Sequence, residues 1–396
     1  MPDPATTPHL GRLHILTHDE VQSIFSLPQF TAAERGLYFS LTPAELEALA
    51  PARSFASKLN FILQLGYFKA RHLFFNFAWQ AVAADVEFIR QKYFPNGKKK
   101  LLDLLQVVKN TVFRQRRIIA ALGNYQFCGR SQRAMLTQAA KNSARISGQP
   151  IYIFRELFAF LQTHRIILPG YSFLQDLIAQ ALRSESARLR TLLQNQLTAD
   201  HTEQLENLLS VAAGFYEITH LKHEPRDFSR TEIKRETARG LQIKELYHLA
   251  QVVLPSLGIS NQSIAYYASL VMYYRVDKLK RFATGTTSLY LLCFIHQRYQ
   301  RVHDNLINCL LYRVRLYSDQ AKEFATRKLS SLQLTTHQQI GKAADVLRLL
   351  TDEQFSPETP FGLVQQQAFA ILGRDEINQI AAHIAQASPL DESQFR

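Results

Sequence analysis

The stretch TAAERGLYFSLTPAELEALAPARSFASKLNFILQLGYFK, residues 31–69, decides the fold class of this chain. It contains two of three closely spaced pairs in which a threonine precedes a glutamate by three residues: Thr17/Glu20, Thr31/Glu34 and Thr42/Glu45. In such a capping box the threonine hydroxyl accepts a hydrogen bond from an early helical N–H, and the glutamate accepts one from the threonine N–H. Each pair therefore predicts the first turn of a short helix.

A longer helix is predicted directly after these short ones. Pro43 suits the first position of the third helix, because the N–H of that position has no helical partner. Over residues 57–69, one helical face then carries the apolar residues Leu59, Ile62, Leu63 and Tyr67. Four short helices so close together are typical of a small bundle or a helix-turn-helix-like module.

The rest of the chain has helical periodicity, without convincing strand alternation or the repeat of a solenoid. Turn residues separate the helical stretches at Pro95-Asn96-Gly97, Gly148-Gln149-Pro150 and Pro169-Gly170. Further helices are predicted at residues 74–94, 101–115, 131–143, 151–164, 171–197, 243–253, 263–274 and 287–328. The sequence therefore predicts an all-α fold, with tandem small helical modules followed by a longer helical bundle.

Two stretches have unusual composition. Residues 72–84 form the richest apolar run, which is too short to span a membrane and is predicted to be a buried helix. Residues 223–239 form the most polar stretch and are predicted to be a linker or an exposed loop.

Positive charge is concentrated in one part of the chain. The net charge is +13 at neutral pH, and thirteen Lys and Arg residues lie between Arg90 and Arg145, where the one acid is Asp103. A positive field confined to one segment attracts a polyanion. A basic face that only contacts water would have the same composition, but the concentration of charge favours nucleic-acid binding.

Two groups within this basic segment are expected to contact DNA differently. Lys98, Lys99 and Lys100 follow a predicted turn, so their flexible side chains suit phosphate contacts. Arg130, Gln132 and Arg133 begin a predicted helix, an arrangement that can read base edges in a major groove or contact phosphates. The expected DNA-binding residues are Ser57, Lys58, Asn60, Lys98, Lys99, Lys100, Arg114, Arg116, Arg117, Arg130, Gln132, Arg133, Lys141 and Arg145.

Cysteine content and hydropathy indicate the compartment. The three cysteines, Cys128, Cys293 and Cys309, are few, distant and odd in number, which favours a reducing interior over a disulfide framework. No apolar run approaches the roughly 20 residues that span a bilayer, and no signal-peptide pattern is present. We therefore expect a cytoplasmic, nucleoid-associated protein that does not enter a membrane.

The sequence offers little for catalysis or metal binding. The candidate carboxylates for a two-metal site are scattered: Asp85, Asp103, Asp176, Asp277 and Asp304. Another four residues lack the tight paired spacing of a zinc site, so packing is their favoured role: Cys293, His296, His303 and Cys309. Packing is likewise favoured over base stacking for Tyr266, Tyr267, Tyr273 and Tyr274. No phosphate loop or nucleophile elbow occurs, and no cofactor is expected.

Two segments of the chain resemble the N-terminal region of Tn3-family transposases. Leu41-Thr-Pro-Ala-Glu-Leu46, followed by Leu59-Asn-Phe-Ile-Leu-Gln-Leu-Gly-Tyr67, is similar to the first DNA-binding module of that family. Arg165-Ile-Ile-Leu-Pro-Gly170, followed by Phe173-Leu-Gln-Asp-Leu-Ile178, is similar to the end of its second module. A weaker similarity begins at Leu279-Lys-Arg-Phe282 and continues through residues 289–295. The resemblance covers most of residues 10–330.

The resemblance implies tandem helical modules that bind the terminal inverted repeats of a transposon. The expected division is a first DNA-binding module at residues 10–72, a basic second module at 73–170, a long-helix connector at 171–222, a third module for DNA binding or dimerisation at 240–330, and an acidic tail at 331–396. The expected partners are double-stranded DNA at transposon ends, a second copy of the chain, or a separate catalytic transposase chain.

Catalysis is not expected from this chain by itself. The resembled transposases carry their catalytic acids in an RNase H-like domain, and the strands that such a domain needs are not indicated by this sequence. The alternative to a transposon DNA-binding protein is a helical RNA-binding or scaffold protein with one basic module.

Overall fold

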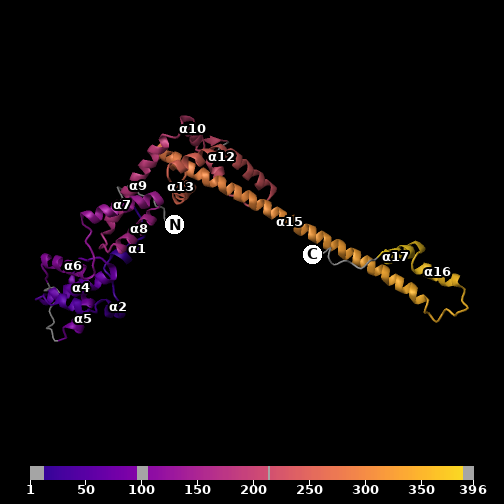
Figure 1. Cartoon of the computed structure of the whole chain (residues 1–396), viewed down its shortest axis with the longest axis horizontal. Helices are drawn as coiled ribbons and strands as arrows, with labels where there is room; N and C mark the ends of the chain where they lie inside the picture. Colours follow the sequence, from indigo (N-terminus) through magenta and orange to yellow (C-terminus); the bar gives the residue numbers. More distant parts are fainter. Residues whose placement is uncertain (1–12, 96–105, 213–214, 387–396) are drawn as a thin grey trace. The chain divides into compact units, whose positions relative to one another are not determined.

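The computed structural model describes residues 13–95, 106–212 and 215–386 of the chain. In these ranges the fold is all-α, as predicted, and α-helices follow one another along the sequence (Figure 1). The strand pair in the described part is a two-residue antiparallel ladder, β1 (Val211–Ala212) with β2 (Phe215–Tyr216). No helix within the described residues is long and apolar enough to cross a membrane. The chain divides into two compact units, residues 1–305 and 306–396.

All three predicted capping boxes form. In each, the threonine hydroxyl accepts from the glutamate N–H, and the glutamate carboxylate accepts from the threonine N–H at 2.8 Å. These boxes begin α1 (His18–Phe25), α2 (Ala32–Tyr38) and α3 (Pro43–Leu49). The fourth predicted helix is α4 (Phe55–Arg71), whose N-terminus is capped by the Ser54 hydroxyl. The prediction of four consecutive helices is therefore confirmed.

The first core of unit one surrounds α4, which is buried along most of its length. It packs against α2, α3, α5 (Ala83–Tyr93) and α6 (Lys109–Leu122). Gly66 lies so close to Phe39, the residue that follows α2, that a Cβ atom at Gly66 would collide with the phenyl ring. Asp85 of α5 accepts a hydrogen bond from the Tyr67 hydroxyl at 2.6 Å and one from Arg35 Nε at 2.7 Å. One of the aspartates considered as a metal ligand thus joins three helices.

The helix predicted over residues 74–94, including the buried helix over residues 72–84, is wrong in its first part. His72 ends α4 in the left-handed conformation with φ 51°. Residues 73–78 are non-helical, and the short 3₁₀ helix η1 (Trp79–Val82) leads into α5. Side chains replace the helical hydrogen bonds here, because the carbonyl of Phe75 accepts from both Gln64 and Arg116 at 2.7 Å. An apolar run alone does not reveal such long-range donors.

The second core of unit one brings α1 together with helices from much later in the sequence. It is formed by α1, α7 (Arg130–Ile146), α8 (Pro150–Thr163) and α9 (Tyr171–Gln194), which confirms the helices predicted there. The Tyr171 hydroxyl accepts a hydrogen bond from the backbone of Leu16 at 3.0 Å. The division of this region into two modules stays a prediction.

Three helices end at the joint between these two cores. His72, Asn124 and Arg165 follow α4, α6 and α8, and all three have positive φ values, of 51°, 55° and 47°. A left-handed residue lets the chain turn sharply away from a helix axis. The turned segments then pair, because Gln126 donates to the carbonyl of Arg165 at 2.8 Å and Leu168 donates to that of His72 at 3.1 Å. The Arg165–Gly170 motif is therefore a structural joint.

The third core of unit one begins on α9, whose Leu189 and Leu193 lie further along the helix than the residues in the second core. Tyr267 belongs to this core, with its ring centroid 5.2 Å from that of Tyr290, as predicted for a packing residue. The other members of the core come from α10 (Ala199–Asn207), α11 (Glu217–Lys222), α12 (Arg230–Ser256), α13 (Asn261–Tyr273), α14 (Val276–Lys280) and the first part of α15 (Thr284–Leu349).

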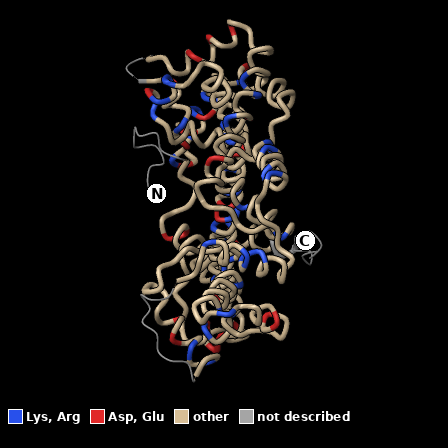
Figure 2. The backbone as a smooth tube through the Cα atoms, turned by 90° about the vertical axis from the view of Figure 1, so that its left-hand side faces the viewer, with Lys and Arg blue, Asp and Glu red and all other residues tan. Residues whose placement is uncertain are grey.

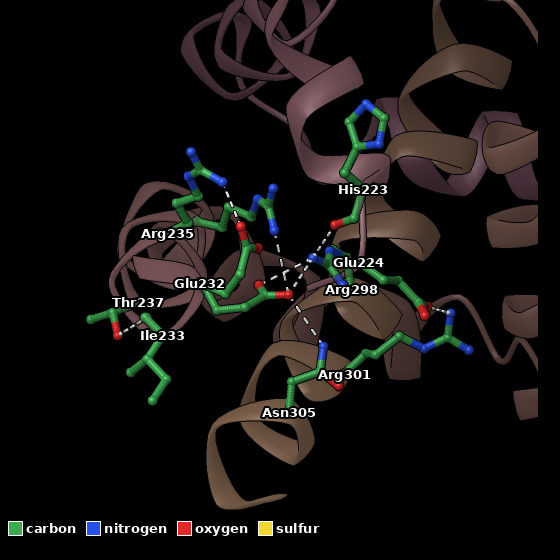
Figure 3. A network of polar contacts seen from close by, with 11 residues as sticks. His223, Glu224, Glu232, Ile233, Arg235, Thr237, Arg298, Arg301 and Asn305 are labelled. Atoms are coloured by element: carbon green, nitrogen blue, oxygen red, sulfur yellow. Dashed lines mark hydrogen bonds and ion pairs between the residues drawn. The ribbon is translucent and has the colours of Figure 1, made fainter. Parts of the chain in front are cut away.

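The linker predicted at residues 223–239 is wrong from Arg230 onward, where α12 begins. Glu236 of this helix is fully buried and accepts hydrogen bonds from Arg298 of α15 at 2.9 Å and from Asn305 at 3.2 Å. The same guanidinium donates to the carbonyl of His223 at 2.8 Å (Figure 3). Charged residues that look solvent-exposed in the sequence are thus buried by partners that lie far along the chain.

The helix predicted at residues 287–328 is longer in the structure, since α15 comprises 66 residues. Unit two contains the rest of this helix together with α16 (Phe361–Ile371) and α17 (Arg374–Gln386), so much of the acidic tail is helical. Exposed apolar side chains follow spacings of three and four along α15 at Ile307, Leu310, Val314 and Tyr317. This spacing is typical of a helix that packs lengthwise on another helix. The homodimer stays a prediction.

Candidate nucleic-acid interface

The helices α6 and α7 lie in a stretch without acidic residues. No Asp or Glu occurs between Asp103 and Glu156. Figure 2 colours Lys and Arg blue and Asp and Glu red along the backbone. The exposed basic side chains of α6 and α7 are Lys109, Arg114, Arg117, Arg130, Arg133, Lys141 and Arg145. With no carboxylate nearby in sequence, their charge is not neutralised within the stretch.

Packing fixes which side of α7 is exposed. Leu136, Ala140 and Ala144 are buried in the second core. Arg130, Lys141 and Arg145 are exposed, and their spacing of eleven and four residues places them on one helical face. The predicted helix over residues 131–143 therefore presents basic side chains near both of its ends to solvent.

The helix predicted at residues 101–115 is wrong in its position. The described helix α6 begins at Lys109 and continues to Leu122, while residues 101–105 lie outside the described residues. Gln115, Ile119 and Ala120 face the first core. Arg114 and Arg117 consequently lie in the middle of α6, on its exposed side, and not at the polar end of a helix.

Arg116 is a structural residue. Its Nη2 donates to the carbonyl of Phe75 at 2.7 Å and to Asn76 Oδ1 at 2.8 Å. The guanidinium carbon lies 5.5 Å from the centre of the Phe74 ring. Burial lowers the pKa of this guanidinium from its ordinary value. The side chain of Arg116 thus holds the non-helical residues that follow α4, and its contact with DNA stays a prediction.

Two residues of the first predicted module are also internal. Asn60 donates to Gln115 Oε1 at 2.6 Å, and the amide of Gln115 donates to the Ser57 hydroxyl at 2.9 Å. Ser57 and Asn60 are buried, so their predicted contact with DNA is corrected. Lys58 lies beside them on α4 and is half-buried. The polar side chains join α4 to α6 in the described part of the chain.

The start of α7 is tied to the segment that connects it with α6. Gln132 donates to Gln126 Oε1 at 2.9 Å and is half-buried. Arg133 is exposed, its Nε donates to the carbonyl of Cys128 at 3.3 Å, and its guanidinium carbon lies 5.3 Å from the Phe173 ring centre. A guanidinium has five N–H donors, so Arg133 keeps donors for a phosphate or a base. Lys98, Lys99, Lys100 and Asp103 lie outside the described residues.

Aromatic residues on this surface were not among the predicted site residues. Phe113 lies on the exposed side of α6 and is 60% exposed, while Phe127 of the connecting segment is 39% exposed. The available signal was a phenylalanine directly before three closely spaced arginines, in the sequence Phe113-Arg114-Gln115-Arg116-Arg117.

The other candidate chemistry is not assembled in the described structure. Within residues 13–95, 106–212 and 215–386, no three His, Cys, Asp or Glu side chains are grouped so that they could hold a metal ion. Cys293 and Cys309 are buried on α15. Burial raises the pKa of the Cys293 thiol, so this thiol packs as a neutral group.

A family match covers the part of the chain that carries this surface. Residues 15–181 match the family described as "Domain of unknown function (DUF4158)". These residues include the first two cores, the joint between them, and both α6 and α7. No curated protein matches the chain. The described structure is thus an all-α protein whose matched region carries exposed basic helices.

Proposed function

We propose that the chain binds double-stranded DNA through α6 and α7. The observation that carries this proposal is the set of exposed Lys and Arg side chains in a stretch without acidic residues. Duplex DNA is a dense line of phosphates, and the release of its counterions drives binding to such surfaces. The rigid cores behind both helices would hold the basic side chains in fixed positions.

We further propose that the DNA is a terminal inverted repeat and that the chain is the DNA-recognition part of a Tn3-type transposase. The two segments that resemble those transposases support this. One forms the start of α3 and the middle of α4, and the other forms the joint beside the α6–α7 connection and the first part of α9. Recognition is assigned to this chain, while cleavage and strand transfer are not.

Binding is tested by fluorescence anisotropy with two duplexes, one carrying the inverted repeat that flanks the gene and one with the same bases scrambled. If about six basic side chains meet phosphates, log affinity should fall against log salt with a slope of about −5 for both duplexes. The repeat should bind at least about ten-fold more tightly, because a single bidentate arginine–guanine contact contributes roughly 1–3 kcal/mol of discrimination.

Three other outcomes would correct the proposal. An affinity that does not change with salt would remove the nucleic-acid function. Equal affinity for both duplexes would leave DNA binding and remove recognition of the repeat. Tighter binding to structured RNA than to either duplex, at the same salt concentration, would favour the alternative of an RNA-binding protein.

A further inference from the structure

A column of aromatic rings extends from the first core to the exposed side of α6. The ring centroids of Phe68 and Phe74 are 4.7 Å apart, those of Phe74 and Phe127 are 6.0 Å apart, and those of Phe127 and Phe113 are 6.4 Å apart. Exposure increases along the column from 4% at Phe68 to 39% at Phe127 and 60% at Phe113. The column therefore ends in a ring that is open to solvent.

The inner rings are held from several sides. The guanidinium of Arg116 lies over the Phe74 ring, while its Nη2 donates to the carbonyl of Phe75. Phe127 directly follows Gln126, whose backbone pairs with Arg165 and Ile167 at the joint between the cores. A ring that is already fixed loses little conformational freedom when another flat group stacks on it.

Two exposed arginines of α6 lie close in sequence to the outer ring. Arg114 is adjacent to Phe113 in sequence, and Arg117 lies one helical turn further along α6. A nucleotide carries a flat base and a phosphate a short distance apart, and proteins bind unpaired nucleotides by combining aromatic stacking with basic side chains. The charge on this side of α6 complements the phosphates that accompany a base.

We propose that Phe113, supported by Phe127, stacks on an unpaired base of DNA whose phosphates contact Arg114 and Arg117. The inference rests on the proposed DNA binding and adds a preference for DNA that contains an unpaired base. A base within an intact duplex is stacked on both sides, so it offers no face to the Phe113 ring. Intact duplex is bound by the basic side chains alone.

The test compares a short duplex with the same duplex carrying one unpaired 2-aminopurine at its centre, at one salt concentration. The wild-type protein should bind the bulged duplex about ten-fold more tightly and should quench the 2-aminopurine fluorescence. Phe113→Leu keeps an apolar side chain but removes the ring, so the two affinities should come within about two-fold of each other. Its affinity for the intact duplex should match that of the wild type.

Phe361→Leu is the matched control, because it removes another exposed ring, which is 72% exposed, at the start of α16. It should keep the preference for the bulged duplex. Equal wild-type affinity for both duplexes would overturn the stacking proposal and leave duplex binding in place. A preference retained by Phe113→Leu, with a lowered melting temperature, would show that the ring only packs. No binding to either duplex would overturn the proposed function itself.

Discussion

The combined replacement of Arg114, Arg117, Arg130 and Lys141 by glutamate is expected to abolish duplex DNA binding at physiological salt. Each substitution removes a basic side chain whose contact with a phosphate would release a counterion from the DNA. It also adds a negative charge that repels the phosphates. The affinity of the variant should fall by more than about 100-fold, and the remaining salt slope should be smaller by about 3 to 4. Anisotropy titrations with one duplex over a series of salt concentrations measure both quantities.

The fold should survive these four substitutions. All four side chains are exposed, and within the described residues they make no hydrogen bond or ion pair. The melting temperature of the variant should therefore equal that of the wild type, so that lost binding reports on contacts with DNA.

A matched control separates local charge from net charge. Replacing Arg315, Lys322, Lys342 and Arg374 by glutamate changes the net charge by the same amount at exposed positions of α15 and α17. This control should retain the wild-type affinity within about three-fold. Equal losses in both variants would mean that total charge, and not the surface of α6 and α7, attracts DNA.

Glu236→Ala is expected to destabilise unit one more than any exposed substitution. The carboxylate of Glu236 is fully buried and pairs with Arg298 of α15, which is 5% exposed. Removing one partner of a buried ion pair leaves the other charge without compensation, which costs about 3–5 kcal/mol. The melting temperature followed by circular dichroism should drop by on the order of 10 °C.

Two variants test whether loss of the buried ion pair causes this destabilisation. Glu224→Ala removes an ion pair with Arg301, in which nitrogen and oxygen are 2.7 Å apart. The side chain of Glu224 is 56% exposed and that of Arg301 is 60% exposed, so the free energy of unfolding should change by less than about 1 kcal/mol. Glu236→Leu combined with Arg298→Met replaces these two charges with apolar groups and should recover part of the lost stability. Recovery should be incomplete, because Arg239, whose guanidinium lies 3.5 Å from the Glu236 carboxylate, also loses its partner. A double variant as unstable as Glu236→Ala would show that packing of the glutamate, and not its charge, stabilises the helix pair.

Helix positions with a local cause could be predicted from the sequence. Thr17, Thr31 and Thr42 each begin a helix because the hydrogen-bond partner lies three residues away. Periodic apolar residues gave α7, α8 and α9 for a similar reason, since one helical face must be buried.

The errors arise where distant partners decide the structure. Residues 73–78 are apolar but not helical, because the side chains of Gln64 and Arg116 bind the carbonyl of Phe75. Glu236 lies in a highly charged stretch but is buried, because it pairs with Arg298, which lies 62 residues further along the chain on α15. Neither partner can be identified from the local pattern.

The candidate surface shows the same division. The sequence by itself determined the fold class and located the basic charge, because helix caps, periodicity and composition depend on neighbouring residues. The tertiary structure decided which basic and polar side chains remain available: Arg114 and Arg117 are exposed, whereas Arg116 and Asn60 are bound inside the protein. It also brought Phe127 beside Phe113, because the chain turns sharply after α6 at Asn124 and Gln126 then pairs with Arg165 of the joint.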